Sequence, residues 1–344
     1  MRDMNALKIS RVLLTIMAAL LGLAAIAYAN NLLVNGGFEA GFHRQAGING
    51  VVPNNWTVVN EVGNPTYFDN TAERIEGEHS LYIESQDIET PPLPGKPFKL
   101  DVYQKVPVIS GTTYALEGLM VTFCAGTAGS PNPPCPSSYY LGKSVGLDPF
   151  GGVDPAGASV VWSPEDRRDA REARWVHLGA TAVARGSSMT VFLRMNSPFQ
   201  FHGALGFMDG FQLSPAPVVS LASHPSVQSS TDVLFSWTGW MDPSLRNDGD
   251  YRLYYDVQVR DTTTSAWTTV ASDVGALNVW SFTGLVGHTY AYRVRAVAHQ
   301  PQLPDCGTCA GVNHFFAGLY SDPAFVSVGV NLNVSHVLLP LVRR

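Results

Sequence analysis

The chain has 344 residues, a formal net charge of −6 and only 15% charged residues. This acidic balance leaves no basic surface for a nucleic acid, so we expect no nucleic-acid partner. The length is too great for one ordinary small domain and suggests two. Plentiful glycine and proline, 32 and 23 residues, favour an all-β chain of strands and turns with few helices.

Residues 1–29 are predicted to be a signal peptide and not part of the fold. Basic residues precede an apolar run over 12–27, and Ala27-Tyr28-Ala29 has the small-x-small pattern that a signal peptidase needs. The alternative is an uncleaved membrane anchor, because the run is about long enough to cross a bilayer. We expect a secreted or cell-surface protein with no stable transmembrane span after cleavage.

Short strand patterns separated by turns fill the region from 31 to 216. A mixed-sign run over 164–174 interrupts them and predicts a solvated loop or one exposed helical turn. Short strands at this spacing predict a β-sandwich or a barrel. The expected strands include Ser80–Ile83, Asp101–Val106, Tyr114–Val121, Trp175–Leu178 and Met189–Met195.

The order of these segments resembles the galactose-binding-like jelly roll of secreted carbohydrate-binding modules. The resemblance implies a jelly-roll carbohydrate-binding-like domain over 30–216, with its first and last strands side by side and Trp56 and Trp175 in the core. The segments that carry it are "NLLVNGGFE" at 31–39, "VPNNW" at 52–56, "EGEHSLYI" at 76–83, "VYQKVPVISGTTYAL" at 102–116, "ARWVHLGATAVARGSSMTVFLR" at 173–194 and "GFMDGFQL" at 206–213.

The same resemblance implies a structural calcium ion, Ca2+. In these modules the ion takes the acid after "GGF", the acid of the last strand and groups from the turn before the "SLxI" strand. Here those groups would be Glu39, Asp209, the Glu76 carboxylate or carbonyl and the His79 carbonyl, a donor set of the oxygen type that calcium prefers. The alternative is that Asp209 only accepts hydrogen bonds from backbone amides beside the first strand.

Glycan binding requires aromatic faces for the sugar rings and planar polar groups for the hydroxyls. The resemblance adds Gln104, which stands where such modules often have a polar residue in the cleft. Each candidate could instead be structural. The candidates for the exposed concave face or its rim are Tyr103, Tyr140, Trp162, Phe192 and Arg194.

We expect no enzyme, because no G-x-S-x-G, H-E-x-x-H or P-loop motif occurs and no carboxylate pair is nominated for glycoside hydrolysis. The predicted function is exported, non-catalytic binding of a polysaccharide or glycoconjugate, with other cell-surface proteins as further partners. One alternative is a structural or adhesive cell-surface protein without a sugar ligand. Another is an accessory part of a glycoside-hydrolase system.

After a stiff linker at 215–217, the region 217–329 resembles a fibronectin type III domain, which implies an immunoglobulin-like β-sandwich. Trp237 matches the core tryptophan of that domain. Leu285 with Tyr290 matches its tyrosine corner, in which the hydroxyl bonds back to the backbone. Alternating strand patterns occur at Val233–Trp237, Tyr254–Arg260 and Leu285–Val297.

The four cysteines form two close pairs, Cys124 with Cys135 and Cys306 with Cys309. An exported protein meets an oxidising compartment, so we predict a disulfide within each pair. A redox or zinc site at the second pair has no supporting helix N-terminus or second ligand pair. The apolar tail at 330–344 is similar to an "LPLVxR" ending found on exported bacterial proteins, or it is a last strand.

Overall fold

The computed structural model describes residues 31–85, 97–123, 140–170, 174–198, 204–242, 251–264, 266–275, 277–300 and 314–329. Within these ranges the chain is all-β, as predicted. They contain no helix with the length and apolarity to cross a membrane. The predicted signal peptide at 1–29, the four cysteines and the tail at 330–344 lie outside the described residues.

The described residues form two compact units. Unit 1 comprises those within Met1–Pro217, Met241–Arg252 and Ala298–Leu319. Unit 2 comprises those within Val218–Trp240, Leu253–Val297 and Tyr320–Arg344.

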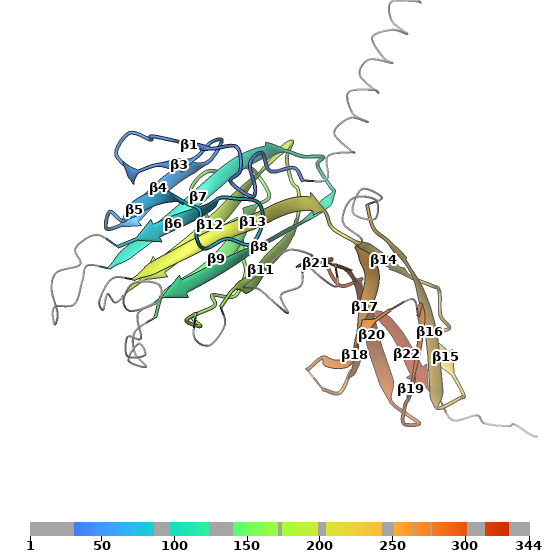
Figure 1. The fold of residues 1–344 in the computed structure, drawn as a ribbon. Coiled ribbons are helices and arrows are strands. Elements are labelled where there is room, and N and C mark those ends of the chain that lie inside the picture. Colours follow the sequence, from blue (N-terminus) through green and yellow to red (C-terminus); the bar gives the residue numbers. More distant parts are fainter. Residues whose placement is uncertain are drawn as a thin grey trace, which may run out of the picture. The chain divides into compact units, whose positions relative to one another are not determined.

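Unit 1 contains two large β-sheets that pack face to face as a jelly-roll sandwich (Figure 1). One sheet has the order β10-β9-β12-β7-β4, and the other has the order β11-β8-β13-β6-β5-β2. The strands are β1 (Phe42–His43), β2 (Asn49–Gly50), β3 (Val52–Pro53), β4 (Thr57–Val62), β5 (Thr66–Asn70), β6 (Ser80–Glu84), β7 (Phe98–Pro107), β8 (Thr113–Phe123), β9 (Gly142–Asp148), β10 (Val161–Trp162), β11 (Val176–Val183), β12 (Ser188–Ser197) and β13 (Leu205–Pro215).

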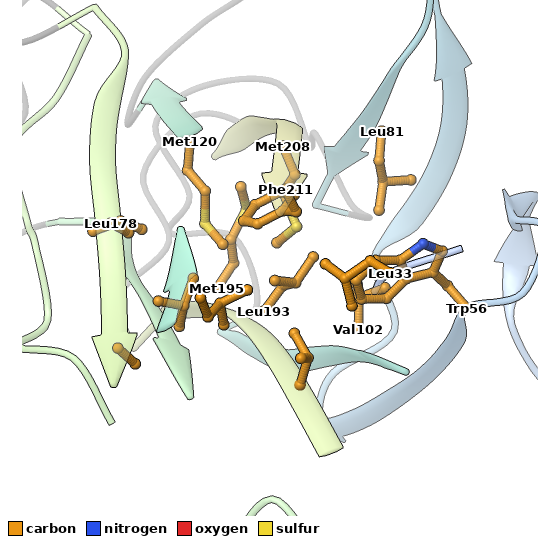
Figure 2. Packing of buried hydrophobic residues seen from close by; sticks show 14 of the residues in the cluster. Leu33, Trp56, Leu81, Val102, Met120, Leu178, Leu193, Met195, Met208 and Phe211 are labelled. Atoms are coloured by element: carbon orange, nitrogen blue, oxygen red, sulfur yellow. The ribbon is translucent and has the colours of Figure 1, made fainter. Parts of the chain in front are cut away.

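The core lies between the two sheets because alternate residues of each strand point inward. Val102 and Leu193 of the five-stranded sheet meet Leu81 and Met208 of the six-stranded sheet in one buried cluster (Figure 2). Trp56 belongs to this cluster. The other predicted core tryptophan is also buried, but in a smaller separate cluster: Ile75, Leu119, Val121, Trp175, Leu205 and Phe207.

The beginning of the domain closes onto its last strand, β13. The Asn31 side chain donates to the Phe211 carbonyl at 2.8 Å and accepts from the Leu213 amide at 3.0 Å. Gly36 lies directly against this strand, because a Cβ at that position would be 2.1 Å from the Phe211 carbonyl oxygen. The "NGG" segment therefore needs glycine for the close approach of two backbones.

The remaining strands belong mainly to unit 2, where they form a sheet of order β14-β16-β19 and a larger sheet of order β15-β22-β20-β17-β18. They are β14 (Val218–Leu221), β15 (Val227–Gln228), β16 (Asp232–Trp240), β17 (Arg252–Asp261), β18 (Thr268–Val274), β19 (Val279–Thr283), β20 (Thr289–Gln300), β21 (His314–Ala317) and β22 (Ala324–Val328).

Aromatic residues from both sheets fill the core of unit 2. Trp237 is 1% exposed, and the rings of Phe235 and Tyr292 stack with their centroids 4.2 Å apart. The Leu285 amide donates to the Tyr290 hydroxyl at 2.9 Å. These are the two residues that the sequence analysis matched to a tyrosine corner.

Candidate functional site

The outer face of the five-stranded sheet gathers most of the predicted glycan-binding residues. Strand register places Phe192 opposite Tyr103 on one side and opposite Gly146 on the other, and Trp162 of β10 is also opposite Gly146. The Phe192 ring centroid lies 5.9 Å from those of both Tyr103 and Trp162. We call this surface, with Arg194, the aromatic face.

Phe192 is fully buried, so the expectation that it is exposed is corrected. Its neighbours on β7 and β10 hold rings that contact it from both sides, while Tyr103 and Trp162 remain half-buried. Phe192 therefore supports the aromatic face from below and does not itself reach a ligand.

Trp162 is covered by a cation. A Cβ at Gly146 would be 2.7 Å from the indole ring, so Trp162 rests directly on the sheet at a residue without a side chain. The Arg194 guanidinium lies over the ring, with its carbon 3.9 Å from the ring centroid, a distance typical of a cation–π interaction. Tyr103 is also half-buried. Among the described residues no cation lies over its ring.

Two carboxylates hold Arg194 in place. Its Nε and Nη2 atoms donate to the two Asp101 oxygens at 3.0 and 3.1 Å, and Nη2 also reaches Glu61 at 2.7 Å. Lys99 Nζ lies 2.7 Å from the other Glu61 oxygen. Burial raises the pKa of Asp101, and its contact with Glu61 raises it further, although Arg194 opposes the shift.

The pKa of Glu61 moves in the opposite direction. Partial burial acts to raise it, but the hydrogen bonds from Asp101 and Lys99 and the charges of Arg194 and Lys99 lower it overall. The contacts with Asp101 and Glu61 fix the plane of the Arg194 guanidinium. Sequence reasoning found Arg194 but missed Asp101, Glu61 and Lys99, although Lys99, Asp101 and Tyr103 have the same parity along β7.

Tyr140 lies at another part of the same surface. The Arg167 guanidinium is 4.0 Å from its ring centroid, and Arg167 Nε donates to Glu165 at 2.6 Å. The other Glu165 oxygen accepts from the Asn196 side chain of β12 at 3.2 Å. A segment that the sequence showed only as a mixed-sign run therefore links Tyr140 to this sheet.

Gln104 does not belong to the aromatic face. It follows Tyr103, so its side chain points to the opposite side of β7, where it is 6% exposed. Its amide accepts from the Val34 amide at 2.8 Å and donates to the carbonyls of Val34 and Asn55 at 2.8 and 3.0 Å. The prediction of a ligand contact is corrected, because these bonds commit Gln104 to holding the N-terminal segment.

The four residues predicted to bind calcium lie around one turn. Asp209 accepts from the amides of Ile75 and Glu76 at 2.7 and 3.2 Å. Glu39 accepts from the His79 amide at 2.8 Å. Among the described residues no group of three or more His, Cys, Asp or Glu side chains is placed to hold a metal ion.

The electrostatics of this turn are unusual for carboxylates. Burial raises the pKa of Asp209 to about 8, and the neighbouring Glu76 charge adds to the shift, although amide hydrogen bonds from Ile75, Glu76 and Gly210 oppose it. Asp209 is completely buried. The donor atoms are hard oxygens of the type that calcium prefers. Both Asp209 oxygens already accept backbone amides, Oδ1 from Gly210 at 2.7 Å and Oδ2 from Ile75 and Glu76.

The six-stranded sheet carries a second polar group, which sequence reasoning did not identify. Glu117 is fully buried, with one oxygen 2.7 Å from His177 Nε2 and the other accepting from the Tyr251 hydroxyl at 3.0 Å. Burial raises the pKa of Tyr251, and the Glu117 charge adds to the shift. Both carboxylate oxygens are thus occupied by side chains of unit 1, which indicates a structural contact.

No family model matches this sequence, and no curated protein matches it. Among solved structures, TmCBM61 in complex with β-1,4-galactotriose is similar over 54% of this chain and 99% of its own, at 14% identity and a TM-score of 0.36. A non-crystalline-cellulose-specific carbohydrate-binding module, CBM28, is similar over 54% and 95%, at 13% identity and a TM-score of 0.29. A β-1,2-glucanase from Parabacteroides distasonis covers 80% of this chain and 37% of its own, at 12% identity and a TM-score of 0.25.

Proposed function

We propose that this is an exported, non-catalytic protein that binds a polysaccharide or glycoconjugate through the aromatic face of unit 1. The observation that carries the proposal is the cluster of Tyr103, Trp162 and Arg194 on one face of a rigid sheet. A half-buried tyrosine provides an apolar surface for a sugar ring. The fixed guanidinium and its carboxylates provide planar groups for hydroxyls.

Tyr103→Ala is expected to weaken glycan binding several-fold, because a lost aromatic contact is worth about 0.5 to 1.5 kcal/mol beyond its burial. A broad glycan array with the full chain identifies the ligand, and titration of the best glycan measures the change. Phe68→Ala is the matched control, because Phe68 is 37% exposed on the other sheet, where it stacks on Tyr82.

If Phe68→Ala weakens binding as much as Tyr103→Ala does, the proposed face is wrong. If the wild-type chain is retained by no glycan of the array, the structural or adhesive alternative replaces the proposal.

We extend the proposal to a structural calcium ion at the turn over 75–79. Glu39 and Asp209 would hold it from the two ends of the domain, together with Glu76 and the His79 carbonyl. The carboxylates of Glu39, Glu76 and the buried Asp209 near one turn support this proposal. The ion would supply positive charge that stabilises the fold, and nothing places a reacting group beside it.

Removing calcium is expected to lower the melting temperature of unit 1 by about 5 to 10 °C, because a ligand at 100 times its Kd stabilises by about 2.7 kcal/mol. Calorimetry with and without a chelator measures the shift. Glu39→Ala, at an exposed position, should abolish the response. Asp154→Asn, at an exposed acid elsewhere in unit 1, should leave it unchanged. Equal melting with and without chelator excludes the site.

We also propose that 217–329 is a fibronectin type III-like domain that follows, in the sequence, a jelly-roll domain over 30–216. The buried Trp237, the strand order β14-β16-β19 and the Leu285–Tyr290 contact support it.

A further inference from the structure

Unit 2 carries a row of alternating arginine and aromatic side chains on one face of its larger sheet. The Arg293 guanidinium carbon lies 4.2 Å from the Trp267 ring centroid and 4.4 Å from that of Tyr320. Arg260 lies 4.7 Å from the Trp267 centroid, and Arg295 lies 5.0 Å from that of Tyr320. We call these five residues the arginine ladder.

The ladder concentrates the positive charge of unit 2. Its three arginines are the only Lys or Arg residues among the described residues of this unit. One acid contacts the ladder, since Asp256 pairs with Arg295 at 2.8 Å. The other acids of unit 2 in the described ranges are Asp232, Asp261, Asp273 and Asp322. An otherwise acidic unit thus has one surface with a net charge of about +2.

The guanidinium groups keep donors that the protein does not use. Arg293 donates through Nε and Nη2 to the same Gln258 oxygen, at 2.9 and 2.8 Å, and that partner is neutral. Within the described part of the chain no carboxylate pairs with Arg260 or Arg293. A guanidinium carries five N–H donors in a planar fork that matches a carboxylate or sulfate group.

The spacing of the charges limits the class of partner. Arg293 and Arg295 are two residues apart on β20, roughly 7 Å along the strand, and Arg260 lies on the adjacent β17, about 4.8 Å across. Double-stranded DNA carries one charge per about 1.7 Å, which is much denser. The faces of Trp267 and Tyr320 are occupied by guanidinium groups, so unpaired bases cannot stack on them as single-stranded binding requires.

We propose that the arginine ladder binds an extended anionic polysaccharide, one with a carboxylate or sulfate group on its repeating sugars. Arg260 and Arg293 would each take one acidic group through guanidinium N–H donors, although the Arg260 Nε is buried and would not take part. The rings would hold the guanidinium planes in place instead of contacting the sugar. This site lies in unit 2 and goes beyond the proposed function of the aromatic face.

The test measures binding of the full chain to polygalacturonate, which carries carboxylates, and to dextran sulfate, with uncharged dextran as the neutral polymer. Wild type should bind at least one of the anionic polymers, should not bind dextran, and should bind more weakly as salt increases. The double variant Arg260→Gln and Arg293→Gln should bind the anionic polymer about tenfold or more weakly, because hydrogen bonds to charged groups are lost.

The control double variant Arg44→Gln and Arg185→Gln removes two exposed arginines of unit 1 and changes the net charge equally. It should retain anionic-polymer binding, and so should Tyr103→Ala, which affects only the aromatic face. Equal binding by the ladder and control variants overturns the proposal. So does wild-type binding that is insensitive to salt, or that is stronger for phosphatidylserine vesicles or polyphosphate than for both anionic polysaccharides.

Discussion

Trp56→Ala is expected to lower the free energy of unfolding of unit 1 by about 3 to 5 kcal/mol, the cost typical of truncating a buried tryptophan. Trp56 is 2% exposed in the buried cluster (Figure 2). It packs edge-on against Phe38 with ring centroids 5.8 Å apart. Its indole nitrogen also donates to the Asn35 carbonyl at 2.9 Å. The substitution therefore leaves a cavity and a carbonyl without its donor.

Urea denaturation followed by circular dichroism measures this loss. Trp240→Ala is the control, because Trp240 is 48% exposed on unit 2 and its truncation should change stability by less than about 0.5 kcal/mol. Similar losses for the two variants would show that Trp56 does not lie in the core of unit 1.

Much of this fold could be predicted because its strands alternate in a regular way. The pattern over 101–106 places Val102 inward and Tyr103 outward, which the structure confirms. The same alternation places Gln104 inward with Val102. The prediction that Gln104 contacts a ligand came from the resemblance to the cleft of other modules and conflicted with this alternation. Backbone geometry makes successive side chains of a strand point to opposite faces of the sheet, so the position of a residue along a strand strongly constrains the face on which it lies.

The remainder of the aromatic face depends on contacts between strands that sequence alone does not pair. Asp101 and Glu61 meet because β4 lies beside β7, and Phe192 is buried between Tyr103 of β7 and Trp162 of β10. A single acidic residue in a β-rich chain carries no signal for such a partner. The buried Lys143 was missed for the same reason, since its partners come from another strand and a distant loop.

Lys143→Met is expected to destabilise unit 1 by about 3 kcal/mol, because it removes a buried donor from the Arg168 carbonyl and the Thr122 hydroxyl and one of the two cations that pair with Asp166, the other being Arg168. Lys143 is fully buried and lies 2.9 Å from Asp166. It also donates to the Arg168 carbonyl at 2.7 Å and to the Thr122 hydroxyl at 3.2 Å. Burial lowers the pKa of this lysine although Asp166 opposes the shift.

The control is Arg174→Met, which breaks an ion pair with Glu73 whose arginine is 48% exposed and should cost at most about 1 kcal/mol. Calorimetry compares the two variants. Lys143 also binds the loop that contains Glu165 and Arg167. In this loop Glu165 accepts a hydrogen bond from Asn196, and Arg167 lies over the Tyr140 ring. Lys143→Met should therefore weaken glycan binding at temperatures where the chain is still folded, whereas Arg174→Met should not. Unchanged binding by a folded Lys143 variant would separate this loop from the site.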